Sequence, residues 1–198
     1  KAGIRNAVLV PMYDQCFWQP NREWQKVAGQ KFINFSRHLH EKMTGMGIES
    51  LHVQYFCKPF EERPPVRSER LRGLFWQRYD LVNWNHISSL IKHSDFEKIH
   101  IHKAIDPPGY DFYPPTEYEI ERYGITMTSW LESRAEFLAM MEQADVFFAP
   151  RKFEGIGMSV IEAMAMGRCV VAPDCPIMNE YIRHGWNGML YNLEKLKP

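Results

Sequence analysis

The chain has 198 residues, of which 45% are hydrophobic and 14% aromatic, and this composition supports a folded core and excludes an intrinsically disordered chain. Lysine plus arginine and aspartate plus glutamate both total 24, so the zero net charge argues against a general nucleic-acid partner. The four scattered cysteines contain no Cys-x-x-Cys pair, which favours neither a disulfide framework nor a zinc site and fits a reducing compartment.

The first 60 residues predict a strand, a helix and a second strand. An apolar run predicts a strand at residues 7–12, apolar side chains at helical spacing predict one long helix over residues 21–47, and residues 50–56 predict another strand. This segment is interpreted either as a remnant of a preceding domain or as an extension of the main sheet. A charged, proline-containing stretch at residues 61–72 predicts a connector.

Strand and helix patterns alternate from residue 73 to residue 198. Strands are predicted at residues 73–78, 98–105, 124–130, 145–150, 168–173 and 188–192. Helices are predicted at residues 83–93, 132–144, 157–167 and 178–185, and a proline-rich excursion at residues 106–123. Such alternation favours right-handed βαβ units, hence an α/β, Rossmann-like, mainly parallel sheet with helices on both faces. Ligands of such sheets bind at the carboxyl ends of the strands.

One stretch, FEGIGMSVIEAMAMGRCVVAPD at residues 153–174, follows a predicted buried strand. Its two glycines let a bound group approach the backbone closely. The helix predicted to start near residue 157 has unpaired first amides with partial positive charge, which suit a phosphate. The stretch therefore predicts a phosphate site.

The side chains of this helix add hydroxyl-binding groups. Helical spacing is expected to bury Met158 and Ile161 and to place Ser159 and Glu162 together on the other face. The Ser159 hydroxyl would reach an anion, whereas the carboxylates of Glu162 and Glu154 would accept hydrogen bonds from sugar hydroxyls. Phosphate-binding amides between two carboxylates predict a nucleotide-sugar site. For Glu154 or Glu162 taken alone, one alternative stays open, namely that the carboxylate only stabilises the positive end of the helix dipole or caps the helix.

Two other kinds of site fit less well. A dinucleotide fingerprint is begun by Gly155 and Gly157, but Val160 stands where the third glycine belongs, and the motif lies late in the sheet instead of opening it. His100 and His102 alternate along one strand and face the same side, but no third ligand stands at a suitable spacing. We therefore expect neither a nicotinamide cofactor nor a metal.

The stretch P-R-K-F-E-G-I-G-M-S-V-I-E-A-M-A-M-G-R-C-V-V-A-P resembles the signature of retaining GT-B glycosyltransferases of the group 1, or family 4, type. That signature has two glutamates eight positions apart, then Ala-Met-Ala-x-Gly and a Val-Val-Ala strand. The downstream NEYIRHGWNGMLYN is similar to the tail of the same family. The resemblance covers residues 71–192 and implies the C-terminal, donor-binding half of such an enzyme.

The resemblance also implies residue roles. Glu154 would lie beside the donor sugar as a catalytic group, and Glu162 would bind the ribose hydroxyls. The donor diphosphate would be held by the loop and helix start at Gly155, Ile156, Gly157, Met158 and Ser159.

The first strand of the family ends in Gly-Arg and is followed by a lysine five residues after the arginine. Arg78 matches this arginine and is the second expected catalytic residue, but Gln77 replaces the glycine and Asn83 the lysine. Lys103 is interpreted as a substitute cation. Trp130 ends the strand predicted at residues 124–130 and would either stack on the donor base or pack in the core.

The implied reaction moves a hexosyl group from a nucleotide diphosphate sugar to an acceptor hydroxyl of a glycan, a lipid or a small molecule, in glycan or polysaccharide synthesis. No metal or other cofactor is implied. The acceptor site of the family lies on a separate N-terminal domain, which is expected to be missing from a chain that starts at Lys1. With no run of about 18 apolar residues and no signal-peptide pattern, a cytoplasmic location is expected, free or peripheral at the inner face of a membrane.

Two alternatives to the transferase stay open. One is a nucleotide-sugar epimerase-like enzyme on the same GT-B scaffold. The other is an inactive nucleotide-sugar-binding module, which Asn83 at the position of the family lysine favours.

Overall fold

The computed structural model describes residues 7–60, 69–106 and 108–196. The chain divides into two compact units. The first unit contains residues 1–56, 153–158 and 175–181, and the second contains residues 57–152, 159–174 and 182–198. Two segments after residue 150 thus belong to the same unit as the start of the chain.

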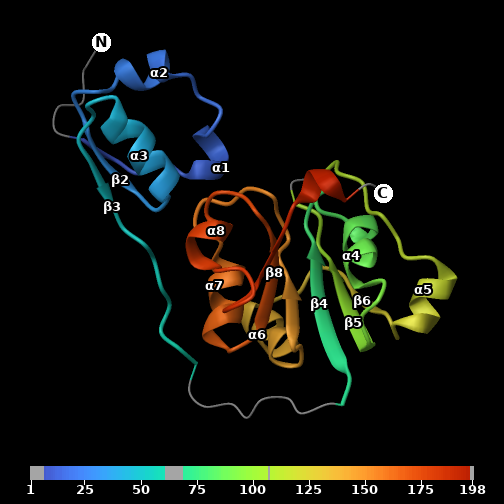
Figure 1. The fold of residues 1–198 in the computed structure, drawn as a ribbon. Helices are drawn as coiled ribbons and strands as arrows, with labels where there is room; N and C mark the ends of the chain where they lie inside the picture. The colour runs from blue at the N-terminus through green and yellow to red at the C-terminus, as the bar shows by residue number, and fades with distance from the viewer. Residues whose placement is uncertain (1–6, 61–68, 107, 197–198) are drawn as a thin grey trace. The chain divides into compact units, whose positions relative to one another are not determined.

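The first unit holds a three-stranded parallel sheet of order β1-β2-β3 (Figure 1). Its strands are β1 (Val8–Leu9), β2 (Lys31–Asn34) and β3 (Ser50–His52). Its helices are α1 (Tyr13–Cys16), α2 (Asn21–Gln25), α3 (Arg37–Gly45) and α8 (Met178–Tyr181). The three strands pair with one another and not with the larger sheet, so they do not extend it as one interpretation of the sequence expected.

The long helix predicted over residues 21–47 is wrong, because strand β2 interrupts it. Phe32, which fits the helical spacing, is buried in β2, and the strand pairs on both sides with β1 and β3. Helix α3 then starts anew after Ser36, whose hydroxyl accepts a hydrogen bond from the Leu39 amide at 3.3 Å. Pairing with strands that are distant in sequence therefore overrode the local helical pattern.

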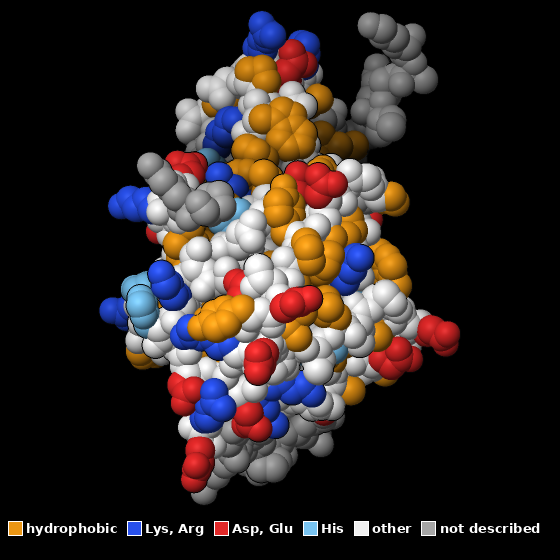
Figure 2. All heavy atoms as spheres, turned by 90° about the vertical axis from the view of Figure 1, so that its right-hand side faces the viewer, with side chains coloured by type: hydrophobic (Ala, Val, Ile, Leu, Met, Phe, Trp, Pro, Cys, Tyr) orange, Lys and Arg blue, Asp and Glu red, His pale blue; other side chains and the backbone are white. Residues whose placement is uncertain are grey.

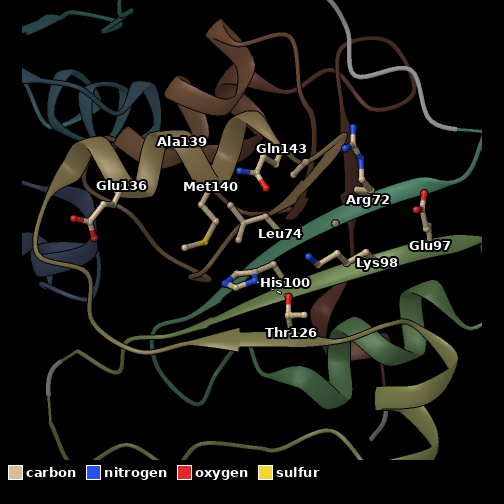
Figure 3. A pocket seen from close by; sticks show the side chains of 12 residues that line it. Arg72, Leu74, Glu97, Lys98, His100, Thr126, Glu136, Ala139, Met140 and Gln143 are labelled. Atoms are coloured by element: carbon tan, nitrogen blue, oxygen red, sulfur yellow. Dashed lines mark hydrogen bonds between the residues drawn. The ribbon is translucent and has the colours of Figure 1, made fainter.

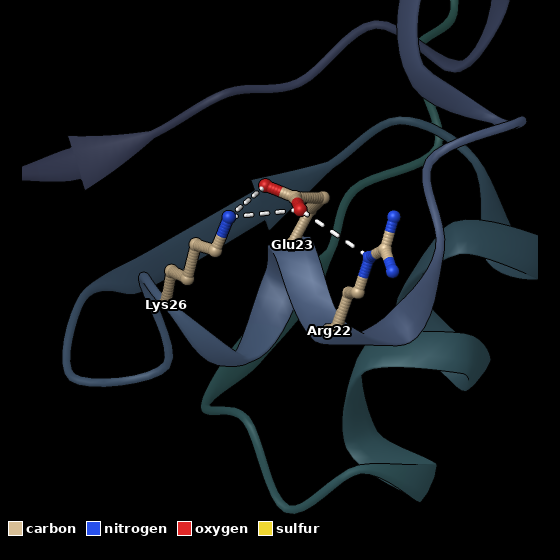
Figure 4. A network of polar contacts seen from close by, with 3 residues as sticks. All are labelled: Arg22, Glu23 and Lys26. Atoms are coloured by element: carbon tan, nitrogen blue, oxygen red, sulfur yellow. Dashed lines mark hydrogen bonds and ion pairs between the residues drawn. The ribbon is translucent and has the colours of Figure 1, made fainter.

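Helix α2 carries a small surface network of ion pairs (Figure 4). Lys26 Nζ lies 2.6 Å from Glu23 Oε2, and Arg22 Nε lies 3.6 Å from Glu23 Oε1. All three side chains are exposed, and such pairs contribute at most about 1 kcal/mol. The network stabilises the surface of this short helix and indicates no site.

The second unit holds a six-stranded sheet of order β6-β5-β4-β7-β8-β9, and every adjacent pair is parallel. The strands are β4 (Leu71–Gln77), β5 (Phe96–Lys103), β6 (Thr126–Thr128), β7 (Val146–Phe148), β8 (Cys169–Pro173) and β9 (Met189–Tyr191). Numbered within this unit, the order is 3-2-1-4-5-6, which is the Rossmann order. The predicted Rossmann-like, mainly parallel fold is confirmed.

Helices cover both faces of this sheet, as predicted (Figure 1). They are α4 (Trp84–Ile91), α5 (Glu117–Arg122), α6 (Arg134–Glu142), α7 (Met158–Ala165) and the 3-10 helix η1 (Leu193–Lys195). On one face Ile87 of α4 packs in a buried cluster with Phe75 and Ile99. On the other face the rings of Trp76 and His102 contact Phe137 of α6. Alternate residues of β4 and β5 thus fill two separate cores.

Helix α5 lies inside the stretch that the sequence predicts only as a proline-rich excursion. It begins after Thr116 with a reciprocal capping box. The Thr116 hydroxyl accepts from the Glu119 amide at 3.3 Å, and Glu119 Oε2 accepts from the Thr116 amide at 2.8 Å. The Thr-x-x-Glu pattern was the signal for this helix.

Charges of both signs intermix over the face of the molecule drawn in Figure 2. This distribution agrees with the equal totals of basic and acidic residues. On this face it does not form the broad basic surface that a general nucleic-acid binder needs.

Candidate functional site

The strand order of the six-stranded sheet reverses between β4 and β7, and ligands of such sheets bind beyond the carboxyl ends of these strands. The segments that follow the two strands touch each other there. The Lys152 amide donates a hydrogen bond to the Tyr79 hydroxyl at 3.3 Å, and the Arg151 guanidinium lies 5.4 Å from the centre of the Tyr79 ring. Buried Tyr79 therefore joins the two loops at the expected binding edge.

Arg78 is held firmly at the end of β4. Its Nη2 lies 2.7 Å from Asp106 Oδ2, and its carbonyl oxygen accepts a 2.7 Å hydrogen bond from the Asp106 amide. The guanidinium also stacks 5.0 Å from the Trp76 ring. Its Nε is buried and has no hydrogen-bond partner within the part of the chain that the structure describes. Arg78 is thus oriented by three contacts.

Two positions near Arg78 that the sequence singled out have structural roles. Gln77 is fully buried and donates through Nε2 to the Asp111 carbonyl at 3.1 Å. Asn83 is the N-cap of α4, with its side-chain oxygen accepting from the Asn85 amide at 3.1 Å. An asparagine suits this position better than the lysine of the family because only it accepts a hydrogen bond.

Lys103 does not substitute for that lysine. Its Nζ lies 4.5 Å from the centre of the Phe112 ring, and Phe112 packs against the buried cluster on the α4 face. Arg78 stacks on Trp76, which packs against α6 on the opposite face. The interpretation of Lys103 as a substitute cation is therefore wrong, because strand alternation turns it to the other side of the sheet.

The loop of residues 153–158 belongs to the first unit. A Cβ atom on Gly155 would lie 3.0 Å from Met12 Sδ and 3.2 Å from Asp14 Oδ1, so glycine lets the loop pack closely on these side chains of the same unit. Gly157 has a φ of 76°, a left-handed conformation that favours glycine. Glu154 between Phe153 and Gly155 is buried. Packing and backbone conformation thus account for both glycines before any ligand is considered.

Helix α7 follows this loop directly, and its burial differs from the prediction. Met158 is 41% exposed, whereas Glu162 is only 5% exposed and is buried together with Ile161. The predicted burial of Met158 is wrong, and Glu162 does not lie on an open face. Ser159 is half-buried. A buried carboxylate such as that of Glu162 requires a partner.

That partner is Arg134, the first residue of α6. The Nη2 atom of Arg134 contacts Glu162 Oε1, and its Nε lies 3.2 Å from the same oxygen. The sequence analysis missed Arg134. The signal for it was a cation at the start of a predicted helix, where the positive end of the helix dipole disfavours a positive charge.

Trp130 lies before this helix and is 62% exposed. The interpretation of Trp130 as a core residue is therefore wrong, and its ring is accessible to a flat ligand.

The two histidines of β5 face the same side, as predicted, and bind threonines of β6. Both ring nitrogens of His100 lie within 2.9 Å of the Thr126 and Thr128 hydroxyls, and His102 Nδ1 lies 3.1 Å from Thr128 Oγ1. Burial lowers the pKa of His102 to about 4, with His100 adding to the effect. Among residues 7–60, 69–106 and 108–196, no group of three or more His, Cys, Asp or Glu side chains is arranged to hold a metal ion.

A cavity of about 660 Å³ lies between α6 and the first halves of β4 and β5 (Figure 3). Met140 of α6 and Gln143, directly after this helix, extend toward Leu74 and His100 of the sheet. The residues that line this cavity include none of the predicted donor-binding residues. The cavity is thus separate from the carboxyl edge at which Arg78 lies.

Comparison with known families matches residues 109–197 to the model described as "Glycosyl transferases group 1". Two curated relatives are similar to parts of the chain. An "Uncharacterized 41.2 kDa protein in cps region" of Klebsiella pneumoniae is 27% identical over 130 residues, which are 65% of this chain and 35% of that protein. The N,N'-diacetylbacillosaminyl-diphospho-undecaprenol alpha-1,3-N-acetylgalactosaminyltransferase of Campylobacter jejuni is 32% identical over 60 residues, which are 30% of this chain and 16% of that enzyme.

Solved structures of glycosyltransferases share the fold. The apo form of the lipopolysaccharide outer core galactosyltransferase WaaB has a TM-score of 0.60 and 19% identity, over 84% of this chain and 49% of WaaB. HepE of Anabaena, solved with UDP and glucose, has a TM-score of 0.62 and 16% identity, over 95% of this chain and 58% of HepE. The pneumococcal O-GlcNAc transferase GtfA, solved with UDP and GlcNAc, has a TM-score of 0.58 and 14% identity, over 96% of this chain and 43% of GtfA.

The chain therefore spans about a third of its first curated relative and about half of WaaB. None of the helices that the structure describes has both the length and the apolar character to cross a membrane. The family match, the names of the relatives and the fold agree with the resemblance of the motif around α7. Through residues 109–197, the chain is similar to the group 1 glycosyl transferases.

Proposed function

We propose that this chain is the donor-binding part of a retaining glycosyltransferase, which moves a hexosyl group from a nucleotide diphosphate sugar to an acceptor hydroxyl. One observation carries the proposal. Glu154 in the loop and Glu162 in helix α7 both follow β7, one of the two strands at which the order of the Rossmann sheet reverses, within the residues that match the family.

In this proposal the donor diphosphate is bound by backbone amides and by a cationic side chain. The amides at Gly157, Met158 and Ser159, with the loop residues Gly155 and Ile156, bind the diphosphate. Arg78 stabilises the negative charge that develops on the leaving diphosphate, since its guanidinium side chain is 28% exposed.

The remaining residues bind the sugar parts and the base. Glu154 orients the donor sugar, Glu162 accepts hydrogen bonds from the ribose hydroxyls, and the exposed ring of Trp130 stacks on the base. No metal takes part in the proposed reaction, because the helix amides and Arg78 supply the positive charge.

The relatives support the choice of donor and pathway. HepE and GtfA were solved with UDP together with a sugar, and HepE also with UDP-glucose. A cps-region protein and a lipopolysaccharide galactosyltransferase are among the similar proteins, which favours glycan or polysaccharide synthesis. A glycan, lipid or small-molecule acceptor, held by a further N-terminal domain, completes the proposal. The cytoplasmic location stays a prediction.

A nucleotide-sugar-binding module without transfer activity is the second candidate. Asn83 caps α4 and Lys103 faces away from Arg78, so neither position supplies the second cation of the family. Binding of the donor without release of nucleoside diphosphate in the presence of acceptors would favour this candidate.

Calorimetry of this chain with UDP, GDP and ADP tests the donor role, and we expect one of them to bind.

In the complete natural protein, Glu154→Ala and Glu162→Ala are each expected to reduce sugar transfer by at least about 100-fold, comparable to the loss of one preorganised contact to the transition state. Circular dichroism checks that both variants fold. Full transfer activity of the Glu154 variant would contradict its assignment.

A further inference from the structure

The contact between Arg134 and Glu162 is asymmetric. Both contacting nitrogens of Arg134 approach the same oxygen, Glu162 Oε1. The second oxygen, Oε2, has no hydrogen-bond partner among the residues that the structure describes. Glu162 Oε2 does not belong to the side-chain atoms that are both inaccessible to solvent and without a hydrogen-bond partner. One half of the carboxylate is therefore occupied and the other half is available.

The position of Arg134 is unfavourable for the stability of its own helix. The first turn of α6 carries partial positive charge, which repels a guanidinium. The hydroxyl of Ser133 accepts from the Glu136 amide at 3.3 Å and already caps this helix. The arginine side chain is 66% exposed, so it adds little to the core. The contact with the buried carboxylate of Glu162 offsets this unfavourable position of Arg134.

We propose that Arg134 is a positioning residue that fixes Glu162 Oε1 so that Oε2 faces the ribose hydroxyls of the donor nucleotide. The inference rests on the proposed role of Glu162 in ribose binding. A free carboxylate in this place would rotate about its last bond, whereas a carboxylate clamped on one oxygen presents the other in one direction. The fork of a guanidinium is suited to this clamp because two of its nitrogens reach one carboxylate group.

The clamp predicts discrimination by the sugar of the nucleotide. A site built to bind a hydroxyl rejects an analogue that lacks it, since the polar group of the protein then loses its partner. Loss of the clamp should therefore weaken binding of a ribonucleoside diphosphate. It should leave binding of the 2′,3′-dideoxy analogue almost unchanged, because that analogue has no hydroxyls for Oε2 to accept from.

The experiment measures dissociation constants by calorimetry for the nucleoside diphosphate that binds best among UDP, GDP and ADP, and for its 2′,3′-dideoxy form. We expect Arg134→Gln to weaken binding of the ribo form by about tenfold, the effect of one charge-assisted hydrogen bond. Glu162→Gln should have a similar effect, and the double variant should lose no more than either single variant. Arg134→Lys should recover part of the loss, since it keeps the charge but not the fork.

Arg122→Gln is the matched control, because Arg122 is an exposed arginine of α5 that packs on Tyr118 and Tyr123. Thermal unfolding of every variant shows whether it folds. An equal loss for both nucleotides in Arg134→Gln, or additive losses in the double variant, would overturn the inference, since Arg134 would then act on the diphosphate or on folding. An unchanged ribose preference would overturn it as well. Failure of the unsubstituted chain to bind any of the three nucleotides would instead overturn the proposed function, and this inference with it.

Discussion

His102 shows how a single buried residue links packing to pH. Its ring is 3% exposed and lies between Trp76, with ring centres 5.6 Å apart, and Phe137, with ring centres 5.9 Å apart. Burial disfavours the charged imidazolium and lowers the pKa of His102 from 6.5 to about 4, with His100 as a second cause. The unfolded chain takes up this proton near pH 6.5, whereas the folded chain takes it up only near pH 4.

The free energy of unfolding should therefore fall as the pH drops from about 6.5 toward 4, because only the unfolded state binds the proton in this range. Between pH 7 and pH 5 the contribution of His102 is about 2 kcal/mol. Urea unfolding at both pH values measures the loss. In His102→Gln the dependence on pH should be weaker by this amount, and the same dependence in both proteins would show that His102 is not its source.

At the scale of elements, Asn83 at the start of α4 stabilises the helix as its N-cap, whereas a lysine there would supply a positive charge. The Asn83 side chain accepts from the Asn85 amide and donates to the Asp80 carbonyl at 2.9 Å. His86 Nδ1 accepts a hydrogen bond from the Asn83 amide at 3.3 Å, and this bond completes the capping box. A lysine at this position would supply the cation of the family but would remove the cap.

Replacing Asn83 by alanine should lower the free energy of unfolding by about 1 kcal/mol, the usual effect of losing an N-cap acceptor. Chemical denaturation followed by circular dichroism measures the change. Asn83→Asp is the control, because aspartate keeps the acceptor and should retain most of the stability. If the alanine variant were as stable as the unsubstituted chain, the cap would not be what fixes this helix start.

At the scale of the whole molecule, the order of the six strands sets the gradient of stability in the second unit. β4, β5 and β7 each have strands on both sides, whereas β6 and β9 lie at the edges. Buried side chains such as Leu74, Ile99 and Phe147 come from the inner strands. Edge strands leave one row of backbone groups without a strand partner.

Amide hydrogen exchange should accordingly be slowest in β4, β5 and β7 and faster in β6 and β9, because inner strands open only with the larger part of the unit. Mass spectrometry of peptides after timed exchange resolves the strands. Slower exchange in β6 than in β4 would contradict this order. The exposed helix α5 is an internal reference for fast exchange, because it has no buried residue of its own.

The sequence by itself determined the alternation of strands and helices after residue 70 and the motif around α7, because both depend on short-range patterns of apolar residues, glycines and charges. It also determined Arg78 as the residue at the end of β4, because chain order alone places it there. Strand β2 and helix α5 were missed. The first depends on pairing with distant strands, and the second on a capping box within a proline-rich stretch.

Only the tertiary structure decided which side chains meet. Glu162 is buried because Arg134, 28 residues earlier, reaches its carboxylate, and no local pattern encodes that contact. Lys103 was excluded as a partner of Arg78 because the alternation of β5 turns it to the α4 face. The order of the strands likewise came from pairing between segments far apart in the chain. Short-range periodicity fixes which elements form, whereas the direction and the partner of a side chain depend on the sheet in which its strand is placed.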